Sequence, residues 1–213
     1  MPEAYRWSDW FVCEILVVLF ILAFFGFLKS RLSVDKPGKI QHTFEVIYEV
    51  VHASAEEIVG HGGGKYMAFF GTIFLFILFM NLVGLIPGFE SPTMSPQVPL
   101  GLAVSTFLFY HAAGLRSNGA GYIKQFLGPM LILAPAMFLI EIISHFARPL
   151  SLTVRLYANM FAGEQVYLTS VAMTKLVVPV IFIGLHLFVS ILQAYIFMLL
   201  AMVYVGGAVS HEH

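Results

Sequence analysis

The chain has 213 residues, of which 59% are hydrophobic and only 11% are charged, and its mean hydropathy is +0.88. Soluble domains carry about 25% charged residues, so this composition indicates an integral membrane protein. The net charge of −1 provides no basic surface for nucleic acid. One cysteine, Cys13, excludes an internal disulfide framework, and the eight histidines show no metal-ligand spacing, so we expect neither a metal nor a cofactor.

The first predicted element is a membrane span over residues 9–28, which are long enough to cross a hydrocarbon core of about 30 Å as a helix. The stretch that follows, KSRLSVDKPGK, is rich in Lys and Arg. Short basic loops lie on the cytoplasmic side of membranes. We therefore expect this loop in the cytoplasm and the N-terminus outside.

Residues 40–60 have a different pattern, in which Phe44, Ile47, Val51 and Ile58 recur at helical spacing against a face rich in glutamate. This pattern predicts an amphipathic helix at the membrane surface. The GHGGGK stretch that follows is one residue short of a phosphate-binding loop and lacks its Ser or Thr. We interpret it as a flexible hinge.

Two further spans are predicted at residues 66–88 and 97–115, each free of Asp, Glu, Lys and Arg. The Pro- and Ser-rich turn between them has no Lys or Arg and is expected outside. Arg116 and Lys124 then mark a return to the cytoplasm.

The last two predicted segments, residues 130–173 and 176–208, are too long for upright spans. At about 1.5 Å per residue, a continuous helix over the first would measure roughly 60 Å, about twice the hydrocarbon thickness. Each is therefore either a split helix or a helix that lies far from the membrane normal. Counting each as one crossing predicts an all-α membrane protein with five spans in a single domain, 1–213, and a cytoplasmic C-terminus.

These two long segments contain polar side chains, although an ionised group at the centre of a bilayer costs at least a few kcal/mol. The first contains Glu141, Ser144, His145, Arg148, Ser151, Arg155, Asn159 and Glu164, and the second contains His186, Ser190 and Gln193. On a helix at about 100° per residue, one face gathers Glu141, Arg148, Ser151, Arg155 and Asn159, while Glu164 points to the opposite side. Asn81 is a further amide in the second span.

The chemistry of these side chains indicates a proton pathway. A guanidinium has a pKa above about 12, so Arg155 is a fixed cation that attracts a carboxylate and repels a passing proton. Glu164 and His186 are groups that gain and lose protons near neutral pH in suitable surroundings. Amides and hydroxyls hydrogen-bond water, which suits the wall of a hydrated path, and the residues of this kind are Asn159, Gln193 and Ser144.

Plainer interpretations exist for several of these residues. Arg148 is expected to be an ordinary interhelical ion-pair partner, and His111 and His145 are expected to be packed or interfacial. The serine hydroxyls can bond to their own helix backbone. For Arg155, the nearby acid on its own face is Glu141, almost four turns away, so its counter-charge is expected on another element or another subunit.

Two other function classes compete with the proton pathway. A stand-alone ion-coupled transporter would use Arg155 to bind an anionic substrate, but the sequence shows no internal repeat. An intramembrane hydrolase would need a nucleophile and a base, and the candidates Ser144 and His145 are adjacent on a helix and do not face each other. The sequence contains no HExxH, CxxC, GxSxG or complete Walker motif.

The stretches RPLSLTVRLYANMFAGE and HLFVSILQAYIFMLLAMVY resemble subunit a of F-type ATP synthases. The likeness includes the spacing Arg–x3–Asn–x4–Glu in the first long segment, His–x6–Gln in the last, and MNLVGLIPG in the second span. It covers residues 65–213, and the first span and the surface helix fit in position and length.

The resemblance implies that the chain is a non-catalytic membrane subunit that moves protons. In this family the last two helices lie strongly tilted against a rotating ring of c subunits, whose carboxylates carry the protons. Arg155 matches the arginine that faces this ring between two offset half-channels. The outer half-channel is matched by Glu164, His186, Asn159, Gln193 and Asn81, and the cytoplasmic one by Glu141 and Ser144.

The resemblance also implies partners and a location: the c-subunit ring, the b-subunit peripheral stalk and membrane lipids, in the bacterial inner membrane. The chain departs from the family at Gly84, where some members carry an acid, and this departure leaves Asn81 with water to serve proton uptake. Glu164 and His186 favour a proton as the transported ion, although sodium-driven relatives exist.

Overall fold

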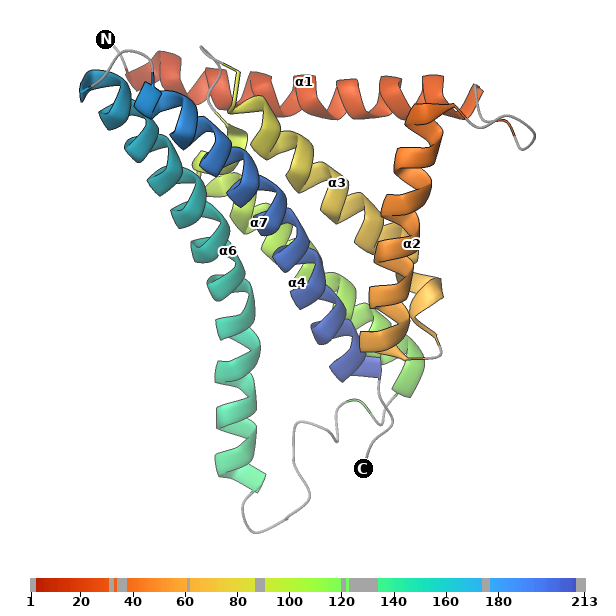
Figure 1. The fold of residues 1–213 in the computed structure, drawn as a ribbon. Coiled ribbons are helices and arrows are strands. Elements are labelled where there is room, and N and C mark those ends of the chain that lie inside the picture. Colours follow the sequence, from red (N-terminus) through yellow and green to blue (C-terminus); the bar gives the residue numbers. More distant parts are fainter. Residues whose placement is uncertain are drawn as a thin grey trace.

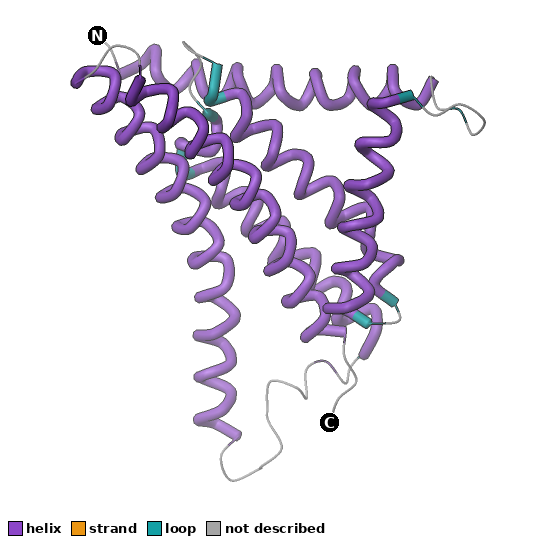
Figure 2. The backbone as a smooth tube through the Cα atoms, viewed as in Figure 1, coloured by secondary structure: helices purple, strands orange, loops and turns teal. Residues whose placement is uncertain are grey.

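The computed structural model describes residues 3–30, 33, 38–60, 62–86, 91–119, 122, 134–173 and 177–209. Within these residues every regular element is a helix, as Figure 2 shows, so the predicted all-α class is confirmed. The elements are α1 (Glu3–Ser30), α2 (Lys39–Val59), the short 3-10 helix η1 (Gly63–Tyr66), α3 (Met67–Val83), the 3-10 helix η2 (Pro92–Met94), α4 (Gln97–Asn118), α6 (Ala134–Met173) and α7 (Val177–Val209). Five of them, α1, α3, α4, α6 and α7, are long and apolar enough to cross a membrane, as predicted.

The helix α2 is amphipathic and runs across the direction of α1 (Figure 1). Val51 and Ala55 on one face are buried, whereas Glu45 and Glu49 on the other face are exposed. A helix of this kind suits the plane of a membrane surface when its neighbour crosses the membrane. It is capped by Gly60, whose φ of 83° lies in the left-handed region that favours glycine.

The helix α6 is continuous over 40 residues, although it contains Pro149. The alternative of a split helix is therefore wrong for this segment. Proline removes one backbone hydrogen bond from a helix interior, here the bond to the carbonyl four residues earlier. Thr153 Oγ1 donates to the Pro149 carbonyl at 2.8 Å, which is an additional bond on the other side of the proline. With a rise of about 1.5 Å per residue, α6 is roughly 60 Å long. Figure 1 shows α6 at a steep angle to α1, so the two helices cannot both lie along the membrane normal.

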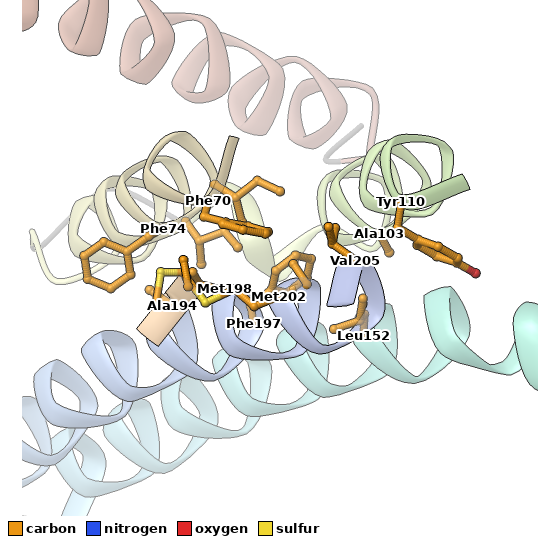
Figure 3. Close-up of a cluster of buried hydrophobic side chains, with 14 of the residues drawn as sticks. Phe70, Phe74, Ala103, Tyr110, Leu152, Ala194, Phe197, Met198, Met202 and Val205 are labelled. Atoms are coloured by element: carbon orange, nitrogen blue, oxygen red, sulfur yellow. The ribbon is translucent and has the colours of Figure 1, made fainter. Parts of the chain in front are cut away.

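The helix α7 lies at the centre of the bundle and packs against α2, α3, α4 and α6. Its inward face carries Ala194, Met198 and Met202, each with a relative exposure of 0%. Figure 3 shows this face against Phe70 of α3 and Leu152 of α6. A small side chain such as Ala194 lets helices approach closely in a membrane. The flexible methionines Met198 and Met202 fill the irregular space beside the phenylalanine rings of the core.

The outer faces of α6 and α7 carry many exposed apolar side chains. They include Phe138, Ile143, Phe146, Leu150, Val154 and Phe161 on α6 and Ile181, Leu185, Phe188 and Ile191 on α7. A continuous apolar surface of this kind needs lipid or another protein against it. One side of the longest helix is thus left open for a partner inside the membrane.

The helix ends differ from the predicted limits where turns intervene. α3 ends at Val83, and a turn over residues 84–86 takes the place of further helix in the predicted 66–88 span. α4 continues past residue 115 to Asn118, whose Nδ2 donates to the Ala208 carbonyl of α7 at 3.0 Å. Residues 130–133 of the predicted 130–173 segment lie outside the described residues.

We predict that Gly63→Ala destabilises the junction between α2 and α3. A Cβ at residue 63 would collide with the backbone carbonyl of Ala55, and no side-chain rotation relieves that collision. Overpacking of this kind costs about 1–3 kcal/mol, so the thermal midpoint of the detergent-purified protein should fall. Gly64→Ala is the matched control, because its Cβ would meet the His52 side chain at an ordinary 3.7 Å. Equal midpoints for the two variants would contradict this contact.

Candidate functional site

Arg155 lies near the middle of α6, at the border between the buried and the open faces of the helix. Its neighbour Leu156 is fully buried, Val154 is 54% exposed, and Arg155 itself is half-buried. In the part of the chain that the structure describes, no carboxylate lies within ion-pair distance of its guanidinium and no hydrogen bond holds it. Arg155 is therefore a permanent cation that the described helices do not neutralise.

A line of amides connects α3, α7 and α6 beside Arg155. Asn159, one turn beyond Arg155, donates from Nδ2 to Gln193 Oε1 at 2.7 Å. Asn81 Nδ2 donates to the Ser190 carbonyl at 3.3 Å, about one turn before Gln193 on α7. The structure thus brings together three of the predicted site residues, which are far apart in the sequence.

Two side chains along this line carry buried polar atoms without a partner. Ser190 is 0% exposed and Gln193 is 2% exposed, and among the described residues Ser190 Oγ and Gln193 Nε2 have no hydrogen-bond partner. Leaving such a group unsatisfied costs about 1–3 kcal/mol, and buried water is the usual remedy. The line is therefore suited to hold ordered water between the helices.

The far end of this line is fixed by two residues that the sequence pattern did not reveal. Thr93 Oγ1 donates to Asn81 Oδ1 at 2.8 Å. Ser91 Oγ lies 2.7 Å from Thr93 Oγ1 and 3.0 Å from the Met80 carbonyl, and Asn81, Ser91 and Thr93 are all buried. The Ser- and Thr-rich turn before α4 was visible in the sequence, but only the fold places it against the end of α3.

Gly84 allows this turn to close onto α3. A Cβ at residue 84 would lie 2.6 Å from Ser91 Cβ and 3.2 Å from Ser91 Cα. Real Cβ atoms do not approach that closely, so any larger residue, including the acid that the resemblance led us to look for, requires the turn at Ser91 to move. The glycine therefore allows Ser91 and Thr93 to lie against the end of α3, where they supply the polar groups around Asn81.

His186 on α7 is buried against α6. Its exposure is 6%, and its Nε2 has no hydrogen-bond partner among the described residues. A Cβ at Gly163 would lie 3.4 Å from His186 Nδ1, so the imidazole rests on α6 where glycine leaves room. Glu164 follows Gly163 directly and is half-buried. Glu164 is therefore the residue on α6 that follows the contact with His186.

A cavity of about 230 Å³ lies beside the first turns of α6 and the last turn of α7, and it has room for several water molecules. The Glu141 carboxylate borders it, 3.3 Å from His145 Nδ1 and partly exposed. Ser144 is half-buried on α6 and does not line the cavity. The remaining polar lining comes from Tyr122, Arg148 and Tyr204.

Arg148, predicted to be an interhelical ion-pair partner, has an aromatic environment among the described residues. Among the described residues no carboxylate lies at ion-pair distance from it. Its guanidinium lies over the rings of Tyr204 and Tyr110, at 5.2 and 5.8 Å from their centroids. A guanidinium within about 6 Å of an aromatic face is attracted by the quadrupole of the ring. The two rings come from α7 and α4, so the local sequence around Arg148 could not indicate them.

His111 and His145 pack against each other, as expected, and they also contact polar groups of the cavity. Their ring centroids are 5.1 Å apart in a stacked arrangement. The Tyr122 hydroxyl lies 2.8 Å from His111 Nδ1, and His145 Nδ1 lies 2.9 Å from the Glu141 carbonyl. His145 therefore lines the same cavity as Glu141, and His111 packs behind it.

These polar groups have the chemistry for moving protons. The described residues contain no group of three or more His, Cys, Asp or Glu side chains placed to hold a metal ion. Carboxyl, imidazole, amide and hydroxyl groups instead gather in two regions, one on each side of Arg155 along α6. Such groups exchange protons with water, whereas the guanidinium between them does not release its own.

Comparison with known proteins identifies the family. The family model described as ATP synthase A chain matches residues 11–206. A protein named ATP synthase subunit a from Solibacter usitatus is 57% identical over 213 residues, which is 100% of this chain and 91% of the relative. Relatives of the same name are 52% identical in Koribacter versatilis, over 97% of this chain and 84% of theirs, and 41% identical in Aquifex aeolicus, over 90% of this chain and 93% of theirs. The chain belongs to the subunit a family of F-type ATP synthases.

Proposed function

We propose that this chain forms the proton path through the membrane sector of F-type ATP synthase, with two offset half-channels that meet a rotating c-subunit ring at Arg155. The observation that carries the proposal is the half-buried guanidinium at the edge of the open face of α6, without a carboxylate partner among the described residues. A cation in a membrane needs a negative partner. Carboxylates that pass on a second protein supply that partner one at a time.

The outer half-channel is assigned to Glu164, His186, Gln193, Asn159 and Asn81. Glu164 and His186 take up protons from the outside. The amide line from Asn81 through Gln193 to Asn159 then holds the water that delivers them to a ring carboxylate. The hydrogen bond between Asn159 and Gln193 and the unpaired buried atoms of Gln193 and His186 support this assignment.

The cytoplasmic half-channel is assigned to Glu141 and the cavity that it borders, with Ser144 on the same helix. The cavity adjoins the C-terminal end of α7. Because we place the C-terminus in the cytoplasm, the cavity lies on the cytoplasmic side. A proton released by a ring carboxylate near Arg155 passes to this cavity and leaves through Glu141. A cavity of this volume has room for several water molecules, which supports the assignment.

Arg155 couples the two half-channels to rotation. Its fixed charge favours the ionised form of an arriving ring carboxylate, so the carboxylate gives up its proton on the cytoplasmic side. The same charge repels protons that would pass directly between the half-channels. A proton must therefore travel on the ring, and rotation of the ring drives ATP synthesis in a soluble sector outside this chain.

The assignment extends to partners and location. The c-subunit ring lies against the open apolar faces of α6 and α7, and membrane lipid and the b-subunit peripheral stalk cover other exposed helix faces. The protein is integral to a membrane, and we assign it to the bacterial inner membrane with the N-terminus outside and the C-terminus in the cytoplasm. The subunit is non-catalytic, and the transported ion is the proton.

Arg155→Ala is predicted to abolish both proton-driven ATP synthesis and ATP-driven acidification of vesicles, because no fixed charge then discharges the ring carboxylates. The assembled complex should remain at its normal level in the membrane. Arg116→Ala is the matched control, since Arg116 is exposed at the end of α4 and lies outside the path. Normal acidification by the Arg155 variant would refute the mechanism.

Gln193→Leu is predicted to slow proton transport by about tenfold, which corresponds to about 1.4 kcal/mol and is the scale of one buried hydrogen bond. The change leaves the Asn159 amide without its acceptor. Asn159→Leu should have a similar effect, and the double variant should be no slower than either single variant, because both remove the same contact. Vesicle acidification rates measure this, and fully additive effects would show that the two amides act independently.

A further inference from the structure

Thr93 carries a buried hydroxyl at the far end of the amide line, and the path described so far gives it no role. It lies in η2, which packs against α1, α3, α4 and α6, and its exposure is 0%. Contacts with four helices leave this turn little freedom to move. A group that the Thr93 hydroxyl holds is therefore held in a fixed position relative to the bundle.

The group that Thr93 holds is the side-chain amide of Asn81. Thr93 Oγ1 donates to Asn81 Oδ1 at 2.8 Å, and Asn81 Nδ2 donates to the Ser190 carbonyl at 3.3 Å. An amide turned by 180° would place its oxygen against the carbonyl oxygen of Ser190, and neither of these atoms carries a hydrogen. Both contacts therefore select the same orientation of the Asn81 amide.

The two contacts differ in strength. The bond from Thr93 has the usual length of an O–H···O bond, whereas the 3.3 Å from Asn81 to the Ser190 carbonyl exceeds the common range of N–H···O bonds, which ends at about 3.2 Å. The bond to α7 is thus too long to hold the amide firmly by itself. The hydroxyl of Thr93 is the stronger of the two restraints.

Ser91 leaves the Thr93 proton free for this contact. A hydroxyl has one proton to donate and two positions that accept. Ser91 Oγ lies 2.7 Å from Thr93 Oγ1 and donates to the Met80 carbonyl at 3.0 Å. The oxygen of Thr93 can therefore accept from Ser91 while its proton stays directed at Asn81.

The orientation of Asn81 matters for the unpaired groups on α7. Asn81 donates to the carbonyl of Ser190, the residue whose own Oγ is buried without a partner among the described residues, and Gln193 Nε2 is in the same condition. A buried water needs two to four polar partners in fixed positions. An Asn81 amide that turned freely would present its donor and its acceptor to such water in alternation.

We propose that Thr93 is a positioning residue of the outer half-channel, whose hydroxyl holds the Asn81 amide with its NH2 group toward α7 and so keeps water in place for proton delivery along the amide line. The inference rests on the proposed function, because Thr93 acts through Asn81. Thr93 exchanges no proton in this role.

The test measures ATP synthesis by inverted membrane vesicles that contain the complete ATP synthase. Their lumen corresponds to the outside of the cell, and it is set to a series of pH values from acidic to neutral while the medium and the membrane potential stay constant. Thr93→Val replaces the hydroxyl by a methyl group. Thr106→Val is the matched control, because Thr106 is also 0% exposed and its hydroxyl donates to the Leu102 carbonyl of its own helix at 2.8 Å.

We expect Thr93→Val to slow synthesis about fivefold when the lumen is near neutral, which converts to about 1 kcal/mol and is the net contribution of one hydrogen bond. When the lumen is acidic, protons are abundant and another step limits the rate, so the variant should approach the wild type. Thr93→Ser keeps the hydroxyl and should follow the wild type throughout, as should the control.

Two results would overturn the inference. One is a Thr93→Val rate equal to that of the wild type at every lumen pH. The other is a reduction by the same factor at every lumen pH, which indicates fewer intact complexes and not slower delivery of protons.

Asn81→Leu separates the inference from the proposed function. Because Thr93 acts through Asn81, adding Thr93→Val to Asn81→Leu should slow synthesis no further. A full second slowing would show that Thr93 acts independently of Asn81 and would overturn the inference alone. An Asn81→Leu rate equal to that of the wild type at every lumen pH would instead refute the place of Asn81 in the outer half-channel, and the inference with it.

Thr93→Cys keeps the test decisive if the valine variant does not assemble. A thiol is a weak donor, so this variant should slow synthesis by a smaller factor, again most when the lumen is near neutral. The level of the complex in the membrane should stay normal. An assembled Thr93→Cys complex that matches the wild type at every lumen pH would overturn the inference.

Discussion

A guanidinium inside a membrane stays charged, because its pKa above about 12 keeps the proton in place at any physiological pH. A helix that carries one must therefore either bury a carboxylate beside it or hold it where a partner arrives from elsewhere. The described helices of this protein provide no carboxylate to Arg155, and they place it at the border of an open apolar face. The rest of the arrangement follows from that placement: the face stays uncovered by the chain itself, and the polar groups lie to either side.

The length of α6 meets a second requirement, the separation of the two polar regions. Glu141 and Glu164 lie on one uninterrupted helix, and their separation of 23 positions corresponds to roughly 35 Å at the usual rise. A rigid helix of that length keeps the polar region at Glu141 apart from the one at Glu164, and no further element is needed between them. α7 runs beside it and contributes partners to both regions, with Gln193 and His186 at one and Tyr204 at the other.

The sequence predicted the helical class and the five candidate spans well, because uncharged runs of sufficient length have few other solutions in a membrane. It also singled out Arg155, Asn159 and Gln193 as candidates, since charged and amide groups are conspicuous in apolar helices. The uninterrupted path of α6 through Pro149 could not be predicted, because the local rule is that proline interrupts a helix. That outcome depends on packing against neighbouring helices.

The contacts that escaped prediction all join residues distant in the chain. The cation–π contacts of Arg148 with Tyr110 and Tyr204 require three helices to converge. The hydrogen bond from Thr93 to Asn81 requires the turn before α4 to fold back on α3. Periodicity reports which residues share a face of one helix. It carries no information on which face of another helix they meet.

The close approach at Gly84 has a consequence for how this protein can change over evolutionary time. The turn at Ser91 occupies the space that a side chain at residue 84 would need, because Ser91 Cβ lies 2.6 Å from where a Cβ would be. A single base change that introduced a carboxylate here would displace Ser91 and disturb its hydrogen bonds to Thr93 and to the Met80 carbonyl. An acid at this position therefore becomes tolerable only after an independently tolerated change in the turn.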